Sequence, residues 1–171
     1  MTDQITSMKS EQGDISRNTG VLPFQSLNAL IRDGELHGIS PITSQQIQPA
    51  SLDLRLGKTA YRMKASFLPG PKRTVKEQID LSSLHQIDLT SGALLETGCV
   101  YLIPLLESLS LSDGISGVAN PKSSTGRLDI FTRLLTDYSS DFDVVARGYH
   151  GPLYAEIFPR TFSIIARTGS K

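Results

Sequence analysis

The stretch GYHGPLYAEIFPR, residues 148–160, decides the fold class of this 171-residue chain. Glycine and proline open it as a turn, and the apolar run that follows has the alternating pattern of a β-strand. Successive side chains of a strand point to opposite faces, so three aliphatic residues share one face while Glu156 lies between two aromatic residues on the other. The first face holds Leu153, Ala155 and Ile157, and the second holds Tyr154, Glu156 and Phe158.

Glu156 has two interpretations at this point. A carboxylate between aromatic neighbours should have a raised pKa, which suits a general acid or base that works near neutral pH. A glutamate on the solvent face of an edge strand has the same pattern. The alternation alone leaves both interpretations open.

Short apolar runs separated by proline, glycine and serine fill much of the remaining chain, which predicts a mainly β sandwich or barrel. The LDLRL segment, residues 52–56, alternates leucine with charge and predicts a half-buried strand. Further strands are expected in YRM (61–63), VYLIPLLE (100–107), GISGVAN (114–120) and FSIIAR (162–167), with a loop at FLPGPKR (67–73).

Two helices are expected among these strands. In PFQSLNALIRDG, residues 23–34, apolar residues recur at helical spacing between a first-turn proline and a terminal glycine. In LDIFTRLL, residues 128–135, Leu128, Phe131, Leu134 and Leu135 have the same spacing, so a second helix should begin near Ser124 or Thr125.

The PKSSTGR motif, residues 121–127, leads into that second helix and combines two cations with two hydroxyls. If Ser123 or Ser124 caps the helix, free backbone N–H groups, the helix dipole, Lys122 and Arg127 together favour an anion or oxyanion site. A capped helix with two solvated cations accounts for the same residues, and it is the commoner outcome for such a sequence.

Composition excludes several classes of function. The chain has 17 basic and 17 acidic residues, so it has no global positive field for polymeric nucleic acid or an anionic membrane. No apolar run approaches the roughly 20 residues of a membrane span, and residues 1–20 lack the apolar core of a signal peptide, so a cytoplasmic protein is expected. One cysteine and three scattered histidines provide no zinc-ligand spacing.

Three motifs in this order resemble the deoxyuridine triphosphatase (dUTPase) and deoxycytidine triphosphate (dCTP) deaminase superfamily. PASLDLRLG, residues 49–57, is similar to its strand signature with a central aspartate, here Asp53, whose role stays open between strand stabilisation and proximity to magnesium. PKSSTGR is similar to its R-S-S-x-x-R motif, with Lys122 in place of the first arginine. GYHGPLYAE, residues 148–156, is similar to the hairpin that ends in the deaminase glutamate.

The resemblance is to the N-terminal half of long, two-domain bacterial dCTP deaminases. It implies a mainly β fold, a dUTPase-like β-clip barrel with a short N-terminal helix and one internal helix. We expect residues 1–20 to be a flexible tail and residues 21–171 to be one such domain, truncated at its C-terminal end. The resemblance further implies a homotrimer or a tandem-domain pseudo-trimer with shared active sites.

The resemblance also assigns roles to residues. Glu156 matches the catalytic glutamate, and Ser123 and Arg127 match the serine and arginine beside the reacting carbon of the pyrimidine. Lys122 and Ser124 match residues near the triphosphate. The implied reaction is zinc-independent deamination of dCTP to dUTP, with Mg²⁺ entering bound to the triphosphate.

The chain departs from the superfamily just before the hairpin. Where an arginine and then an aspartate are usual, it has Val144 and Ala146, which argues against dUTP hydrolysis and leaves Asp143 and Arg147 as possible substitutes. Together with Tyr149, the aromatic residue of the hairpin, these two are candidate substrate-binding residues.

Two further hypotheses remain open. The first is a bifunctional enzyme that takes dCTP to dUMP, which differs from a simple deaminase only in the product and would also act on dUTP. The second is a catalytically silent half that binds a nucleotide such as dCTP or dTTP, or merely completes a trimer.

Overall fold

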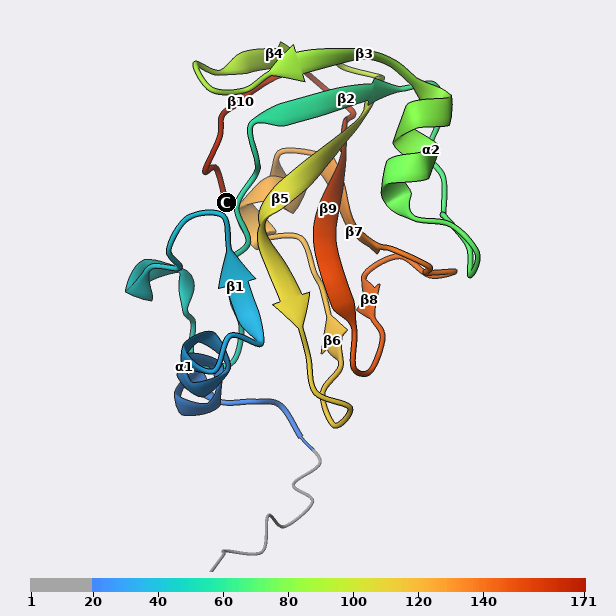
Figure 1. Ribbon diagram of the computed structural model, residues 1–171. Helices are drawn as coiled ribbons and strands as arrows, with labels where there is room; N and C mark the ends of the chain where they lie inside the picture. The colour runs from blue at the N-terminus through green and yellow to red at the C-terminus, as the bar shows by residue number, and fades with distance from the viewer. Residues whose placement is uncertain (1–19) are drawn as a thin grey trace, which may run out of the picture.

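The computed structural model describes residues 20–171, and the flexible tail predicted for residues 1–20 lies, apart from Gly20, outside the described residues (Figure 1). Most of the described elements are strands, and three short helices are interspersed among them. The helices are α1 (Phe24–Arg32), α2 (Val75–Ser82) and α3 (Ser123–Arg127), with a 3₁₀ turn at Ser44–Gln46. The strands are β1 (Leu36–Gly38), β2 (Thr59–Met63), β3 (Ser83–Asp88), β4 (Ala93–Leu95), β5 (Val100–Ser110), β6 (Gly117–Val118), β7 (Ile130–Thr136), β8 (Val144–Val145), β9 (His150–Pro159) and β10 (Ile164–Ala166).

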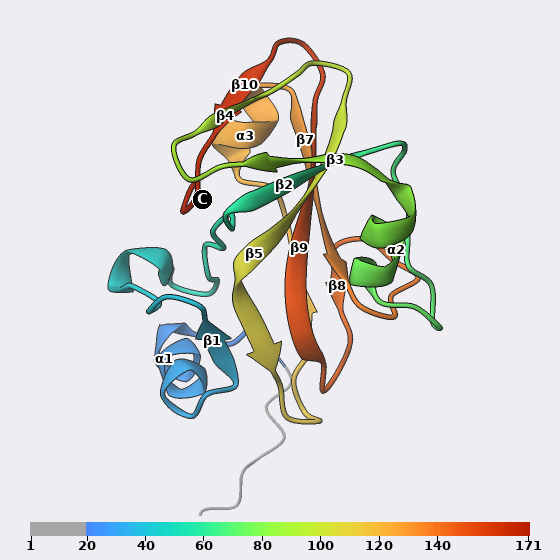
Figure 2. The same cartoon turned by 45° about the horizontal axis from the view of Figure 1, so that its top comes forward.

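One antiparallel sheet organises the molecule. Its strands run in the order β3-β2-β5-β9-β7, and β1 pairs with the far end of β5. The β4–β10 and β6–β8 ribbons form two smaller sheets (Figures 1 and 2). The long strands β5 and β9 occupy the centre because their apolar runs supply side chains for both faces. The prediction of a mainly β fold is confirmed, whereas within residues 20–171 the sheet does not close into a barrel.

Each face of the sheet packs against its own hydrophobic cluster. Leu153, Ala155 and Ile157 of β9 lie in the larger cluster. Tyr154 lies in the smaller one, which α2 covers with Val75 and Ile79. The alternation predicted for residues 153–158 is therefore confirmed, and β9 is a central strand rather than an edge strand.

The helix predicted for residues 128–135 is wrong. Helix α3 stops at Arg127, Asp129 has a φ of 53°, and the chain then forms β7 along β9. Residues with positive φ do not continue a right-handed helix, and IFTRLLT is rich in the β-branched and aromatic residues that strands favour. The serine cap is also wrong, because Lys122 is the N-cap residue and makes no side-chain capping bond.

The strand predicted for residues 52–56 is also wrong. This segment forms only isolated bridges, between Leu52 and Ile47 and between Leu56 and Leu105. Side chains, and not a neighbouring strand, form hydrogen bonds with backbone groups of this segment. Gln46 Nε2 donates to Asp53 O, and Glu107 Oε2 accepts from Arg55 N. The segment is thus fastened by side chains.

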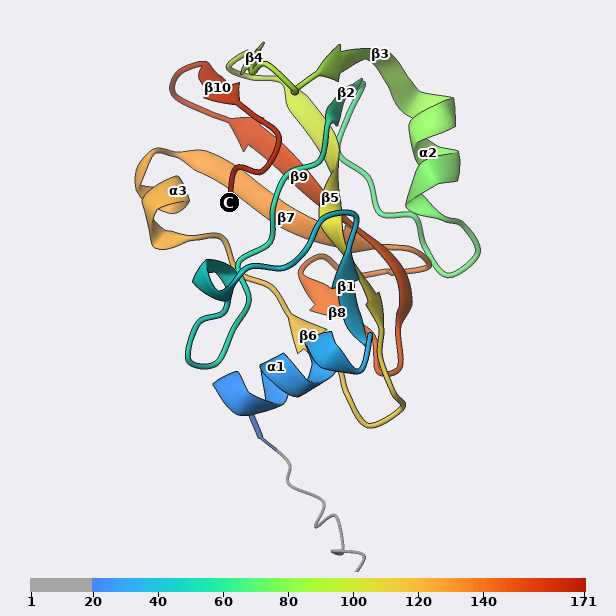
Figure 3. The same ribbon diagram turned by 60° about the vertical axis from the view of Figure 1, so that its left-hand side comes forward.

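The N-terminal helix α1 confirms its prediction, with Leu27 and Leu30 buried. The sequence analysis missed α2, although Thr74 and Glu77 form a capping box there whose spacing is visible in the sequence. The chain ends beside α3, on the side of the molecule opposite α2 (Figure 3). Among the described residues, no helix has both the length and the apolar character needed to span a membrane.

Candidate active site

The pairing of β7 with β9 places Arg133 directly across from Glu156. The Nε and Nη2 atoms of Arg133 donate to Oε1 of Glu156 at 3.1 and 2.6 Å. The side chain of Glu156 is 2% exposed, so this is a nearly buried ion pair. Arg133 of β7 is therefore the guanidinium partner of Glu156, and the alternation in β9 did not reveal it.

Arg133 is held from several sides. Its guanidinium carbon lies 3.5 Å from the centroid of the Phe142 ring and 4.8 Å from that of Phe131. Its Nη2 atom also donates to Ser66 Oγ at 2.7 Å, from the loop between β2 and α2. Stacking and hydrogen bonds of this kind fix a planar guanidinium in one orientation.

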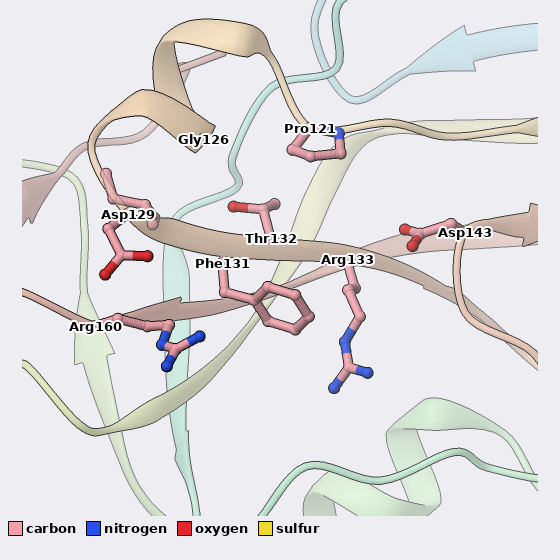
Figure 4. A pocket seen from close by; sticks show the side chains of 9 residues that line it. Pro121, Gly126, Asp129, Phe131, Thr132, Arg133, Asp143 and Arg160 are labelled. Atoms are coloured by element: carbon pink, nitrogen blue, oxygen red, sulfur yellow. The ribbon is translucent and has the colours of Figure 1, made fainter.

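A hollow of about 240 Å³ lies along β7 beside this pair. Figure 4 shows Phe131 and Arg133 on one side of β7 and Thr132 on the other, with Asp143 beyond Arg133. Ligand pockets usually exceed ~300 Å³, so this hollow has room for part of a ligand, such as one ring. It is lined by Pro121, Gly126, Asp129, Ile130, Phe131, Thr132, Arg133, Asp143 and Arg160.

The outer edge of β7 supplies main-chain groups to the hollow. In the described part of the chain β7 pairs with β9 alone. Asp143 N donates to Leu134 O, and Leu134 N donates to Asp143 Oδ1 at 2.7 Å, so the N–H and C=O of Leu134 point away from β9. Alternate residues of an antiparallel strand point the same way. Ile130 and Thr132 therefore present free N–H and C=O groups, which can recognise the edge of a planar polar ring.

Asp143 has a structural task at this edge. Its φ is 63°, and its main-chain oxygen accepts from Ala119 N while one carboxylate oxygen bonds Leu134 N. It lines the hollow, so the structure brings this candidate to the neighbourhood of Arg133.

The PKSSTGR motif lies at one end of the same hollow. Pro121 and Gly126 belong to the lining, and α3 packs against β7. Ser123, Ser124 and Arg127 are on α3 and none of them is buried, so their side chains remain available to a ligand.

Lys122 is oriented by the PASLDLRLG motif. Its Nζ lies 2.8 Å from Oδ2 of Asp53, and Lys171 Nζ lies 3.7 Å from the same oxygen. This resolves part of the open question about Asp53, because the carboxylate is paired with two lysines. Two motifs separated by about 70 residues therefore meet at the start of α3.

Arg147 and Tyr149 lie elsewhere, in a separate hollow that Asp137, Ser139 and His150 also line. Tyr149 is 8% exposed, and its hydroxyl donates to Pro152 O and accepts from Asp137 N. Burial raises its pKa to about 12. The structure thus separates these two candidates from Asp143 and Glu156, and the hydroxyl of Tyr149 is committed to the hairpin.

No group of three or more histidine, cysteine, aspartate or glutamate side chains is arranged to hold a metal ion within residues 20–171. The carboxylate of Asp53, which contacts Lys122 at the start of α3, already faces two ammonium groups. Mg²⁺ prefers several oxygen ligands. Mg²⁺ that enters with a triphosphate therefore stays a prediction from the resemblance.

Arg133 is the residue of this site that the sequence analysis missed. A helix over residues 128–135 would have pointed Arg133 away from any fixed partner. The β-branched and aromatic residues of IFTRLLT, residues 130–136, were the signal that could have identified the strand.

One known family is similar to nearly the whole chain. The profile of the 2'-deoxycytidine 5'-triphosphate deaminase (DCD) N-terminal domain matches residues 18–171. The chain is 32% identical over 112 residues to the dUMP-forming dCTP deaminase of Salinispora arenicola, covering 66% of this chain and 57% of that protein. It is 32% identical over 134 residues to the dCTP deaminase of Haemophilus ducreyi, covering 74% and 66%.

A solved structure is also similar. The crystal structure of 2'-deoxycytidine 5'-triphosphate deaminase from Agrobacterium tumefaciens superposes with a TM-score of 0.86 and 53% sequence identity. The match covers 88% of this chain and 45% of that one, so the chain spans less than half of the Agrobacterium protein. With the profile match over residues 18–171, these similarities show that the chain belongs to the 2'-deoxycytidine 5'-triphosphate deaminase family, in the part that corresponds to its N-terminal domain.

Proposed function

We propose that this chain carries a zinc-independent dCTP deaminase site that converts dCTP and water to dUTP and ammonia in the cytoplasm. The observation that carries the proposal is Glu156, a nearly buried carboxylate with one oxygen anchored by Arg133, and Arg133 in turn lines the ring-sized hollow. Family membership supplies the substrate, and the geometry supplies a candidate base.

In the proposed reaction, Glu156 accepts a proton from a water molecule as the water oxygen attacks carbon 4 of cytosine. This proton then passes to ring nitrogen 3 of the pyrimidine. Glu156 next carries the proton of the new hydroxyl group on carbon 4 to the amino nitrogen, the bond from carbon 4 to that nitrogen breaks, and ammonia leaves as a carbonyl forms. Ser123 and Arg127 orient the water and stabilise the developing charge, and one well-placed donor is typically worth about 3 kcal/mol.

Binding of the substrate uses the two ends of the hollow. The free main-chain groups of Ile130 and Thr132 face the pyrimidine edge, and Lys122 and Ser124 face the triphosphate. Mg²⁺ enters with the phosphates, since the carboxylate beside Lys122 is paired with lysines. Asp143 holds the edge of β7 on which the base lies.

The assembly belongs to the proposal as well. The exposed side chains of Ser123 and Arg127 suit a site completed by a neighbouring unit. That neighbour is another copy in a homotrimer or the second domain of a longer protein.

Two other functions have observations in their favour. The Salinispora relative is described as dUMP-forming, which favours a bifunctional enzyme. Ala146, which stands where the superfamily usually has an aspartate, favours a silent half that binds nucleotide or completes a trimer.

The test is incubation of the protein with dCTP and Mg²⁺, in the presence of a chelator that removes zinc but leaves magnesium, followed by chromatography of the nucleotides. Accumulation of dUTP supports the proposal, and dUMP supports the bifunctional enzyme. Unchanged dCTP, both for residues 1–171 and for any longer form that contains them, would leave the silent half as the remaining function.

A further inference from the structure

Arg133 and Glu156 form an asymmetric pair. Both hydrogen bonds from the guanidinium reach Oε1 of Glu156, at 3.1 and 2.6 Å. Within residues 20–171, no group donates a hydrogen bond to Oε2. That oxygen is also absent from the fully buried polar atoms that lack a partner, which are Thr132 Oγ1 and Thr168 Oγ1. Oε2 therefore keeps some exposure to solvent.

We propose that Arg133 is a positioning residue that anchors Oε1 of Glu156 and thereby directs Oε2 as the oxygen that accepts the proton from water. This inference rests on the proposed deaminase function. A carboxylate held by one oxygen cannot rotate freely, and displacement of a reacting group by about 1 Å can cost 10²-fold in rate.

The surroundings of Arg133 suit such a task. Phe142 stacks on the guanidinium at 3.5 Å, and Ser66 fixes its Nη2 atom at 2.7 Å. Lysine offers a single point charge without a planar fork, so it cannot reproduce both the stacking and the paired hydrogen bonds. Two segments therefore set the orientation of Glu156 through Arg133: the loop before α2, which contains Ser66, and the segment before β8, which contains Phe142.

The experiment compares Arg133→Ala, Arg133→Lys and Phe142→Leu with the parent in steady-state deamination of dCTP. We expect Arg133→Ala to lower kcat about 100-fold with KM within about 3-fold, because the base is misplaced while the substrate still binds. Arg133→Lys and Phe142→Leu should lose less. Guanidinium ion added to Arg133→Ala should restore part of kcat and leave KM unchanged.

Arg62→Ala is the matched control. Arg62 is also held over an aromatic ring of the main sheet, 5.6 Å from the centroid of Tyr101, but has no hydrogen bond to Glu156. It should keep the parental kcat and show no response to guanidinium. If Arg133→Ala fails to fold, Arg133→Lys and Phe142→Leu carry the same comparison.

An unchanged kcat in the Arg133 variants would overturn the inference, and so would a rise in KM with kcat unchanged, because Arg133 would then bind substrate. A parent that does not deaminate dCTP, either as residues 1–171 or in a longer form that contains them, overturns the proposed function instead. In that case crystal structures of the parent and of Arg133→Lys still decide the positioning role. A Glu156 side chain that keeps its conformation in the variant contradicts it, and a displaced carboxylate supports it.

Discussion

Residues 20–171 contain two nearly buried arginine–glutamate pairs, and they differ in how completely the carboxylate is bonded. Arg55 Nε lies 2.7 Å from Glu107 Oε1, with the side chains 13% and 0% exposed. Arg133 Nη2 lies 2.6 Å from Glu156 Oε1, with the side chains 23% and 2% exposed. By distance and burial alone the two pairs would be assigned the same role.

Glu107 has partners for both oxygens. Oε1 accepts from Arg55 Nε and from Gln46 Nε2, while Oε2 accepts from the backbone N–H of Arg55. The arginine is tied further, since its Nη2 atom donates to Ser40 O and Pro41 O. This network fastens residues 40–55 to β5 and leaves no oxygen for chemistry.

Among residues 20–171, Glu156 has hydrogen-bond donors at one oxygen only, and its partner Arg133 lines a hollow. The difference between the pairs indicates that the number of carboxylate oxygens with donors, more than burial, separates a structural ion pair from a candidate catalytic one. Variants of the two pairs test this distinction.

The largest effect is expected for Glu156→Gln. An amide cannot accept and return a proton, so deamination of dCTP should fall by roughly 10²–10⁴-fold. Glu107→Gln is the matched control and should keep the parental rate per folded molecule at temperatures where it remains folded. The measurement is kcat for dCTP with the folded fraction determined by circular dichroism. Equal losses of kcat in the two variants would contradict the distinction between the pairs.

The next largest effect concerns stability. Arg55→Ala leaves the carboxylate of Glu107 buried without its main partner, and breaking a buried pair in this way typically costs about 3–5 kcal/mol. The free energy of unfolding in urea measures it. Arg32→Ala, which breaks an exposed contact with Asp33, is the control and should leave that free energy unchanged. A loss below about 1 kcal/mol for Arg55→Ala would show that residues 40–55 are held by other contacts.

Tyr149→Phe should have a smaller effect that depends on pH. The phenol loses hydrogen bonds with Pro152 O and Asp137 N, which costs about 1 kcal/mol at pH 7. Burial raises the pKa of Tyr149 to about 12 in the folded protein, against an ordinary value of 10.0. The stability from the protonated phenol is therefore fully present below pH 10 and is lost as the pH rises toward 12.

Phenylalanine has no proton to lose, so the parent should lose its advantage over Tyr149→Phe as the pH rises from 10 toward about 12. Urea unfolding of both proteins at several pH values in this range measures the difference. Parallel stability curves for the two proteins would contradict the assignment. Burial is the main cause that raises the pKa of Tyr154, and it acts in both proteins, so this contribution is common to the two curves.

The smallest effect is expected for Asp53→Asn. Its pair with Lys122 is partly exposed, with 45% of the lysine side chain accessible, and such pairs contribute at most about 1 kcal/mol. If Lys122 contacts the triphosphate, loss of the carboxylate that orients its ammonium group should raise KM for dCTP a few-fold at low salt and leave kcat unchanged. Asp80→Asn, which breaks the exposed Lys76–Asp80 pair on α2, serves as control. An unchanged KM would remove Lys122 from the proposed phosphate contacts.

Part of this site could be predicted from the sequence. Glu156 and the PKSSTGR motif were identified from residue types and order, and the two faces of β9 from strict alternation. Arg133 was hidden because the apolar residues of 128–135 fit helical spacing and do not alternate with polar residues. Asp143 and Arg147, four positions apart in the sequence, lie at different hollows because β8 runs between them.

The amino-acid sequence was sufficient to predict a mainly β domain, helix α1, a strand at β9 and the motifs around the candidate site, because local periodicity and motif order are properties of neighbouring residues. Long-range contacts were needed to show that β9 is central, that residues 130–136 form a strand, that Arg133 faces Glu156 and that Asp53 faces Lys122. These contacts join residues 23 and 69 positions apart. The free energy that selects them comes from sheet pairing and burial across the whole domain, which no short stretch of sequence contains.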